Sequence, residues 1–195
     1  MKLNVDRKII LASGSPRRKE LLEKLGLEFE VIKSDVDESS VKVTSPKRLV
    51  AKLAELKADD VANKDNISSD NLIISADTIV AYKNEILGKP KDDLDAMRML
   101  KMLNNKKHQV YTGMCIIDMK TMTKKVCISK TDVLFDKLSD ELIMNYIKTG
   151  ECKDKAGAYG IQDMGSVLVK KIYGDFFGVM GLSVNQLYSE LLKIK

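Results

Sequence analysis

The chain has 195 residues, 33 Lys plus Arg against 28 Asp plus Glu, and 44% hydrophobic residues. The ordinary apolar fraction and dispersed charge exclude collagen-like, low-complexity and disordered proteins, and the length suits a single domain over residues 1–195, with one core or a core split into two lobes. The apolar runs are far shorter than a membrane span and the N-terminus has no signal-peptide core, so we expect a cytoplasmic protein with no membrane partner.

Residues 8–12 predict a short buried strand that leads through a small-residue turn into a helix. Ser15 fits the N-cap of that helix, Pro16 its first position, and Gly26 its end. Further elements are predicted as helices at 46–63, 93–103, 139–149 and 183–192, and as strands at 28–32, 72–82, 85–87, 109–119, 125–134 and 166–172. This mixture indicates an α/β or α+β fold around a mixed sheet.

Cysteine and histidine chemistry has little support in the sequence. Three cysteines without a Cys-x-x-Cys pair indicate structural thiols rather than disulfides or zinc ligands. The single histidine, His108, follows a lysine pair in a polar segment and is expected on the surface. With 4 Phe, 6 Tyr and no Trp, a base-stacking platform for nucleic acid is not expected either.

The segment from Ser13 to Arg18 is the first candidate site. A strand delivers two serines, a glycine and two arginines to a helix N-terminus, where free N–H groups and the helix dipole favour a phosphate. The segment has neither the P-loop nor the Rossmann glycine spacing. The alternative is a capped surface helix with two solvated arginines.

Asp77 is the second candidate, because it lies within the apolar strand predicted at 72–82. A carboxylate in such surroundings needs an ion pair, hydrogen bonds or a metal to offset its desolvation. Either Glu38 or Asp37 could supply a second carboxylate, and such oxygen ligands suit Mg²⁺ or Mn²⁺. A structural salt bridge is the alternative.

Three lysines in helix-end or turn settings form the third group. Lys57 lies late in the second predicted helix, Lys89 in a Gly-Lys-Pro turn, and Lys155 in a loop with nearby glycines that would let backbone approach a ligand. Taken singly, each lysine is expected to be a solvated side chain.

Together these segments resemble the Maf family of nucleoside triphosphate pyrophosphatases, also called septum formation inhibitor proteins. The matching stretches run in family order and are 11–18, 76–80, 87–90, 110–113, 154–162 and 174–182. The resemblance implies an elongated mixed sheet flanked by helices, in two lobes with the substrate in a central cleft, as in inosine-triphosphatase-like enzymes. It also implies that water attacks the α-phosphorus of a nucleoside triphosphate with help from a divalent metal. Because members of the family commonly dimerise, the resemblance implies a homodimer here as well.

The family motifs assign roles to particular residues here. Asp77 falls on the general base, Glu38 and Asp77 on metal ligands, and Ser13, Arg17, Lys57, Lys89 and Lys155 on positions associated with the phosphates. Arg17, Thr78 and Gln162 match the branch that resembles dTTP/UTP pyrophosphatases. This sequence departs from the family pattern at Cys152, at Asp163, where glycine is usual, and at Ser183. A regulatory nucleotide- or nucleic-acid-binding protein of cell division, with incidental hydrolysis, is the alternative.

Overall fold

The computed structural model describes residues 5–194, so the first four residues of the N-terminal segment assessed above and residue 195 lie outside it. The strands are β1 (Lys8–Leu11), β2 (Phe29–Val31), β3 (Asn71–Tyr82), β4 (Glu85–Leu87), β5 (Lys107–Asp118), β6 (Thr123–Phe135) and β7 (Val169–Tyr173). The α-helices are α1 (Pro16–Lys24), α2 (Pro46–Ala62), α3 (Asp93–Leu103), α4 (Asp140–Lys148), α5 (Phe176–Met180) and α6 (Val184–Leu191). The 3₁₀ helices among these described residues are η1 (Glu38–Ser40), η2 (Ala156–Ala158) and η3 (Asp163–Leu168).

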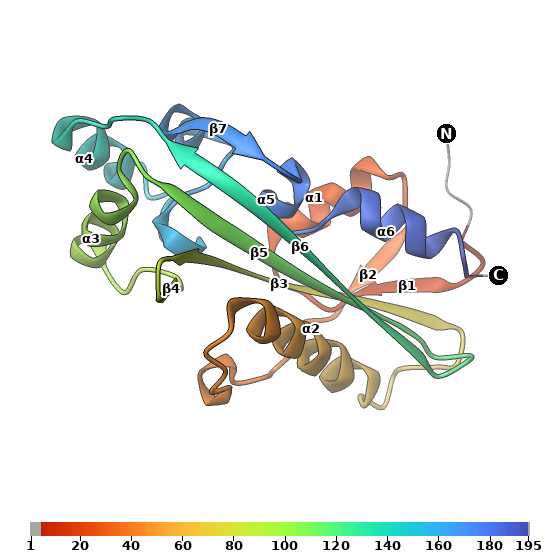
Figure 1. Ribbon diagram of the computed structural model, residues 1–195. Coiled ribbons are helices and arrows are strands. Elements are labelled where there is room, and N and C mark those ends of the chain that lie inside the picture. Colours follow the sequence, from red (N-terminus) through yellow and green to blue (C-terminus); the bar gives the residue numbers. More distant parts are fainter. Residues whose placement is uncertain (1–4, 195) are drawn as a thin grey trace. The chain divides into compact units, whose positions relative to one another are not determined.

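The strands form one seven-stranded sheet in the order β2-β1-β3-β5-β6-β7, with β4 paired to β3 (Figure 1). β1 runs parallel to both β2 and β3, whereas β4 is antiparallel to β3 and β7 is antiparallel to β6. The predicted mixed α/β sheet with flanking helices is therefore confirmed. Within residues 5–194, no helix is long and apolar enough to cross a membrane.

The chain divides into two compact units. The first unit comprises Met1–Asp77, Thr112–Ser129 and Gly181–Lys195, and the second comprises Thr78–Tyr111 and Lys130–Met180. The three long strands β3, β5 and β6 each contribute residues to both units. Each unit has its own cluster of buried apolar side chains.

In the first unit, α2 packs on one face of the sheet. Successive side chains of a strand alternate between its faces, so Ile73, Ser75 and Asp77 of β3 share one face. Ile73 packs with α2 residues such as Ala58, and the Ser75 hydroxyl donates a hydrogen bond to the Ala54 carbonyl. The same strand face that builds the core thus presents Asp77 beside α2.

In the second unit, His108 lies inside the core. The prediction of a surface side chain is wrong, because His108 is 0% exposed and its Nε2 lies 2.7 Å from the Tyr159 hydroxyl. The rings of His108, Phe135 and Tyr159 also meet edge to face. The preceding lysines suggest solvent, but β5 begins at Lys107 and its alternation turns the next side chain inward.

Acid should destabilise the fold through His108. Burial lowers the pKa of His108 to about 4 from its usual 6.5. Between these values the unfolded chain binds the extra proton, so stability is retained above pH 6.5 and falls by about 1.4 kcal/mol per pH unit as the pH drops towards 4. Urea unfolding at pH 7 and pH 5 should show a larger loss for the parent chain than for His108→Gln. Equal losses in both proteins would contradict this assignment, because the chain has one histidine.

The C-terminal third differs from the predicted elements at two places. Residues 166–168 belong to η3 rather than to a strand, so β7 begins at Val169, and the short helix α5 was not predicted. The cysteines match their prediction as free thiols: Cys115 and Cys152 are buried, and burial raises the pKa of Cys115 to about 12.

Candidate functional site

In the first unit, the candidate residues gather at the carboxyl ends of two parallel strands. β1 ends at Leu11, which pairs with Ile74 of β3 and Val31 of β2, while β3 continues to Tyr82. The loops that follow β1 and β2 therefore run beside the middle of β3. In open sheets with parallel strands, ligands commonly bind beyond these carboxyl ends.

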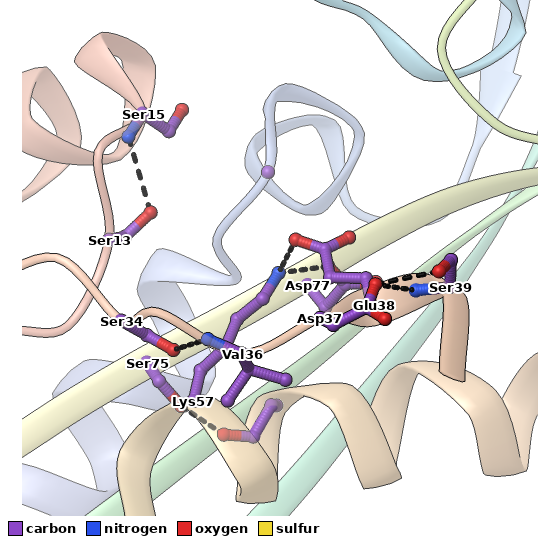
Figure 2. A network of polar contacts seen from close by, with 12 residues as sticks. Ser13, Ser15, Ser34, Val36, Asp37, Glu38, Ser39, Lys57, Ser75 and Asp77 are labelled. Atoms are coloured by element: carbon purple, nitrogen blue, oxygen red, sulfur yellow. Dashed lines mark hydrogen bonds and ion pairs between the residues drawn. The ribbon is translucent and has the colours of Figure 1, made fainter. Parts of the chain in front are cut away.

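Asp77 is buried and paired. Its side chain is 8% exposed, and its Oδ1 accepts a hydrogen bond from the Lys57 ammonium at 2.6 Å (Figure 2). The same ammonium lies 2.8 Å from Glu38 Oε1. Lys57 is 12% exposed and Glu38 is 53% exposed, so the three side chains run from the interior towards the surface.

Glu38, not Asp37, is the second carboxylate of this cluster. Asp37 caps η1, where its Oδ1 accepts hydrogen bonds from the backbone N–H and the hydroxyl of Ser39 at 3.0 and 2.6 Å. These hydrogen bonds lower the pKa of Asp37. The choice between the two acids, which the sequence leaves open, follows from this local turn, as Figure 2 shows.

The Lys57 cluster would suit a divalent cation. Across the described part of the chain, no three Asp, Glu, His or Cys side chains come together as metal ligands. Asp77 and Glu38 nevertheless each direct a carboxylate oxygen at the Lys57 ammonium. Two carboxylates, completed by water and phosphate oxygens, are a usual ligand set for Mg²⁺. The donor chemistry therefore fits a hard divalent metal.

Ser13 and Arg18 form the other part of the site. Ser13 is buried, with 8% of the residue exposed. Its hydroxyl accepts hydrogen bonds from Arg18 Nη1 at 2.9 Å and from the Ser15 backbone N–H at 3.3 Å. Arg18 Nε also donates to the Gly181 carbonyl at 2.9 Å. Ser15 occupies the N-cap position of α1, as predicted, but its side chain makes no capping hydrogen bond.

Arg18 belongs to the first candidate segment, but the family motif assigns a phosphate role to Arg17 alone. Burial lowers the pKa of Arg18, the Asp77 carboxylate raises it, and Arg17 lowers it again. Since guanidinium groups stay charged in proteins, Arg18 places a fixed positive charge near Asp77. The consecutive arginines marked this segment in the sequence, but their spacing alone does not show that the Arg18 guanidinium interacts with Asp77 and Glu38.

In the second unit, the loops that carry Lys89 and Lys155 are joined. The Gly157 N–H donates to the Gly88 carbonyl at 3.0 Å. Lys89 is exposed. Lys155 is folded back on its own loop, where its ammonium donates to the Glu151 carbonyl and to Asp154 Oδ1.

Thr78 and Gln162 are half-buried and also belong to the second unit. Thr78 follows Asp77 in β3, and strand alternation turns these neighbours to opposite faces. Gln162 precedes η3, and the next residue, Asp163, has a left-handed φ of 50°. Glycine adopts this conformation without strain, and aspartate is among the side chains that tolerate it best.

Comparisons with known proteins agree with the fold and the motifs. Proteins named dTTP/UTP pyrophosphatase are 47% identical over 190 residues in Acetivibrio thermocellus, covering 95% of this chain and 94% of that one, and 48% identical over 186 residues in Bacillus cereus, with the same coverages. The solved structure of the Staphylococcus aureus Ham1 protein matches with a TM-score of 0.51 at 15% identity, covering 97% of this chain and all of that one, which supports the fold alone. The model of the family described as Maf-like protein matches residues 8–194, and the chain therefore belongs to the Maf family.

Proposed function

We propose that this protein is a pyrophosphatase that hydrolyses dTTP and UTP to the nucleoside monophosphate and pyrophosphate. The observation that carries the proposal is the buried Asp77 carboxylate, held by Lys57 beside Glu38 at the carboxyl ends of β1 and β2. The names of relatives at about 48% identity support the same reaction and do not favour a regulatory binding protein.

Asp77 acts as the general base. It accepts a proton from the water molecule whose oxygen attacks the α-phosphorus, and the bond from that phosphorus to the bridging oxygen of pyrophosphate breaks. Before ligands bind, the hydrogen bond from Lys57 to Oδ1 holds the carboxylate in place on β3. A general base must meet its proton at hydrogen-bond distance.

Glu38 and Asp77 would hold the divalent metal, Mg²⁺ or Mn²⁺. When bound, such an ion neutralises charge on phosphate oxygens and lowers the pKa of coordinated water. In the first unit, Arg17 and Arg18 on α1 and Lys57 on α2 would supply the remaining positive charge. The family motifs assign Lys89 and Lys155 to the phosphates as well. Fixed cations stabilise the charge that develops on the leaving pyrophosphate in the transition state.

Arg17, Thr78 and Gln162 are assigned to selection of a pyrimidine nucleotide. This assignment rests on the family motif, and a side-chain amide such as that of Gln162 can pair with the donor and acceptor edge of a pyrimidine. We further assign the reaction to the cytoplasm, where the reducing environment suits the free thiols of the chain. A homodimer, implied by the same family resemblance, stays a prediction.

A substrate panel tests the proposal. The purified chain is incubated with Mg²⁺ or Mn²⁺ and each of dTTP, UTP, dCTP, GTP and 7-methyl-GTP, and monophosphate and pyrophosphate are measured separately. We expect equimolar monophosphate and pyrophosphate, fastest from dTTP and UTP. Intact nucleotides together with salt-sensitive DNA binding would support the regulatory alternative instead.

A further inference from the structure

The Lys57 ammonium lies between the Asp77 and Glu38 carboxylates, where a metal ion bound to both would also have to lie. The ammonium lies 2.6 Å from Asp77 Oδ1 and 2.8 Å from Glu38 Oε1. A magnesium ion would sit 2.0–2.1 Å from the same oxygen atoms in the usual geometry. An ammonium at hydrogen-bond distance from both oxygens and a metal bonded to both would crowd and repel each other.

We propose that Lys57 is a displaceable counter-cation of the metal site. In the metal-free protein its ammonium holds Asp77 and Glu38 together, and it leaves both carboxylates when a divalent cation and a polyphosphate bind. This inference rests on the proposed function for the identity of the ligands, and it assigns Lys57 a role before catalysis, besides any contact with phosphate.

The surroundings of Lys57 explain why the two carboxylates need a counter-cation before a metal ion binds. Asp77 is 8% exposed and lies close to the second negative charge of Glu38. Arg18 supplies one positive charge near Asp77, so without Lys57 the two carboxylates would outnumber the cations there. Leaving one charge of a buried pair uncompensated is strongly destabilising. The flexible lysine side chain can supply the missing charge in the metal-free state and move away afterwards, because its stem has several rotatable bonds.

The exchange has a thermodynamic consequence. Binding of metal alone must overcome the ion pairs of Lys57, so the lysine weakens that binding. A polyphosphate offers the displaced ammonium a new anionic partner, so metal and nucleotide should strengthen each other's binding, and linkage makes this coupling reciprocal. Lys57 would thereby keep the metal site in a low-affinity state until a nucleotide arrives.

Titration with Mn²⁺ alone, followed by the paramagnetic resonance signal of free Mn²⁺, tests the proposal without turnover. Lys57→Met and Lys57→Gln should each bind Mn²⁺ about tenfold more tightly than the parent chain, because a positive charge beside the ion is removed. The glutamine can still donate hydrogen bonds to both carboxylates, so Lys57→Gln should stay folded even if Lys57→Met does not. Lys64→Met is the matched control: Lys64 also lies near α2 and pairs with Asp35 and Asp60, away from this cluster.

The same titration with α,β-imido-dUTP present measures the coupling. The parent chain should gain more Mn²⁺ affinity from the analogue than either Lys57 variant does. Folded Lys57 variants that bind Mn²⁺ no more tightly than the parent would overturn the counter-cation role, even if the parent hydrolyses dTTP as proposed. A parent chain that neither binds Mn²⁺ nor releases pyrophosphate would instead remove the proposed function together with this inference.

Discussion

Asp77→Asn is expected to lower kcat for dTTP hydrolysis by about a thousandfold, with the protein still folded. A positioned general base contributes roughly 10² to 10⁴ to the rate, and the amide keeps the size of the carboxylate while losing its basicity and its charge. Because the Asn oxygen can still accept the hydrogen bond from Lys57, we expect the packing around β3 to persist. Single-turnover release of pyrophosphate at saturating dTTP measures the effect on the chemical step.

Asp59→Asn is the matched control for this substitution. Asp59 lies on α2, two positions after Lys57, and pairs at the surface with Lys124. It should retain nearly the parental kcat. If Asp77→Asn released pyrophosphate at a near-parental rate, Asp77 would be removed from the mechanism whatever the result for Asp59.

Gly113→Ala is expected to lower the free energy of unfolding by about 2–3 kcal/mol, in the upper range for overpacking. A Cβ at this position would lie 2.3 Å from the carbonyl oxygen of Val50 and 2.5 Å from its carbonyl carbon, so β5 and α2 would have to separate. The colliding atoms are backbone, which cannot swing aside as a side chain does. Urea unfolding measures the stability, and kcat should fall as well because α2 carries Lys57.

Gly88→Ala provides the comparison. A Cβ at Gly88 would meet no heavy atom within 4 Å, and its φ lies outside the left-handed region. We therefore expect its stability to stay within a few tenths of a kcal/mol of the parent. A Gly113→Ala protein as stable as Gly88→Ala would show that the contact between α2 and β5 relaxes at little cost.

Much of the fold could be predicted because the local signals agreed with one another. The Ser-Pro starts of α1 and α2 and the apolar spacing of α3 predicted helices whose ends lie within a residue or two of those observed. The region after α4 was harder. There, η3 and the five-residue α5 are too short to show a hydrophobic period, and the segment around Val167 alternates like a strand without pairing as one.

One part of the candidate site could be predicted because Asp77 is a charged residue in an otherwise apolar strand. An aspartate in an apolar strand requires compensation, and Asp77 has it in Lys57. The pairing could not be read from the sequence, where Lys57 is a candidate for the phosphates only, because it depends on how closely α2 packs on β3. Arg18 and the choice of Glu38 over Asp37 depend likewise on tertiary packing and on the turn at η1.

The strands β3, β5 and β6 limit how this chain can be cut into folded fragments. Each of these strands has residues in both units, and the first unit is assembled from three separate stretches of sequence. A single proteolytic cut, or a gene truncated at Asp77, would therefore separate the three stretches of the first unit from one another. The first unit can form only in a chain that supplies all three stretches, so a product that ends at Asp77 should not fold it and should be degraded.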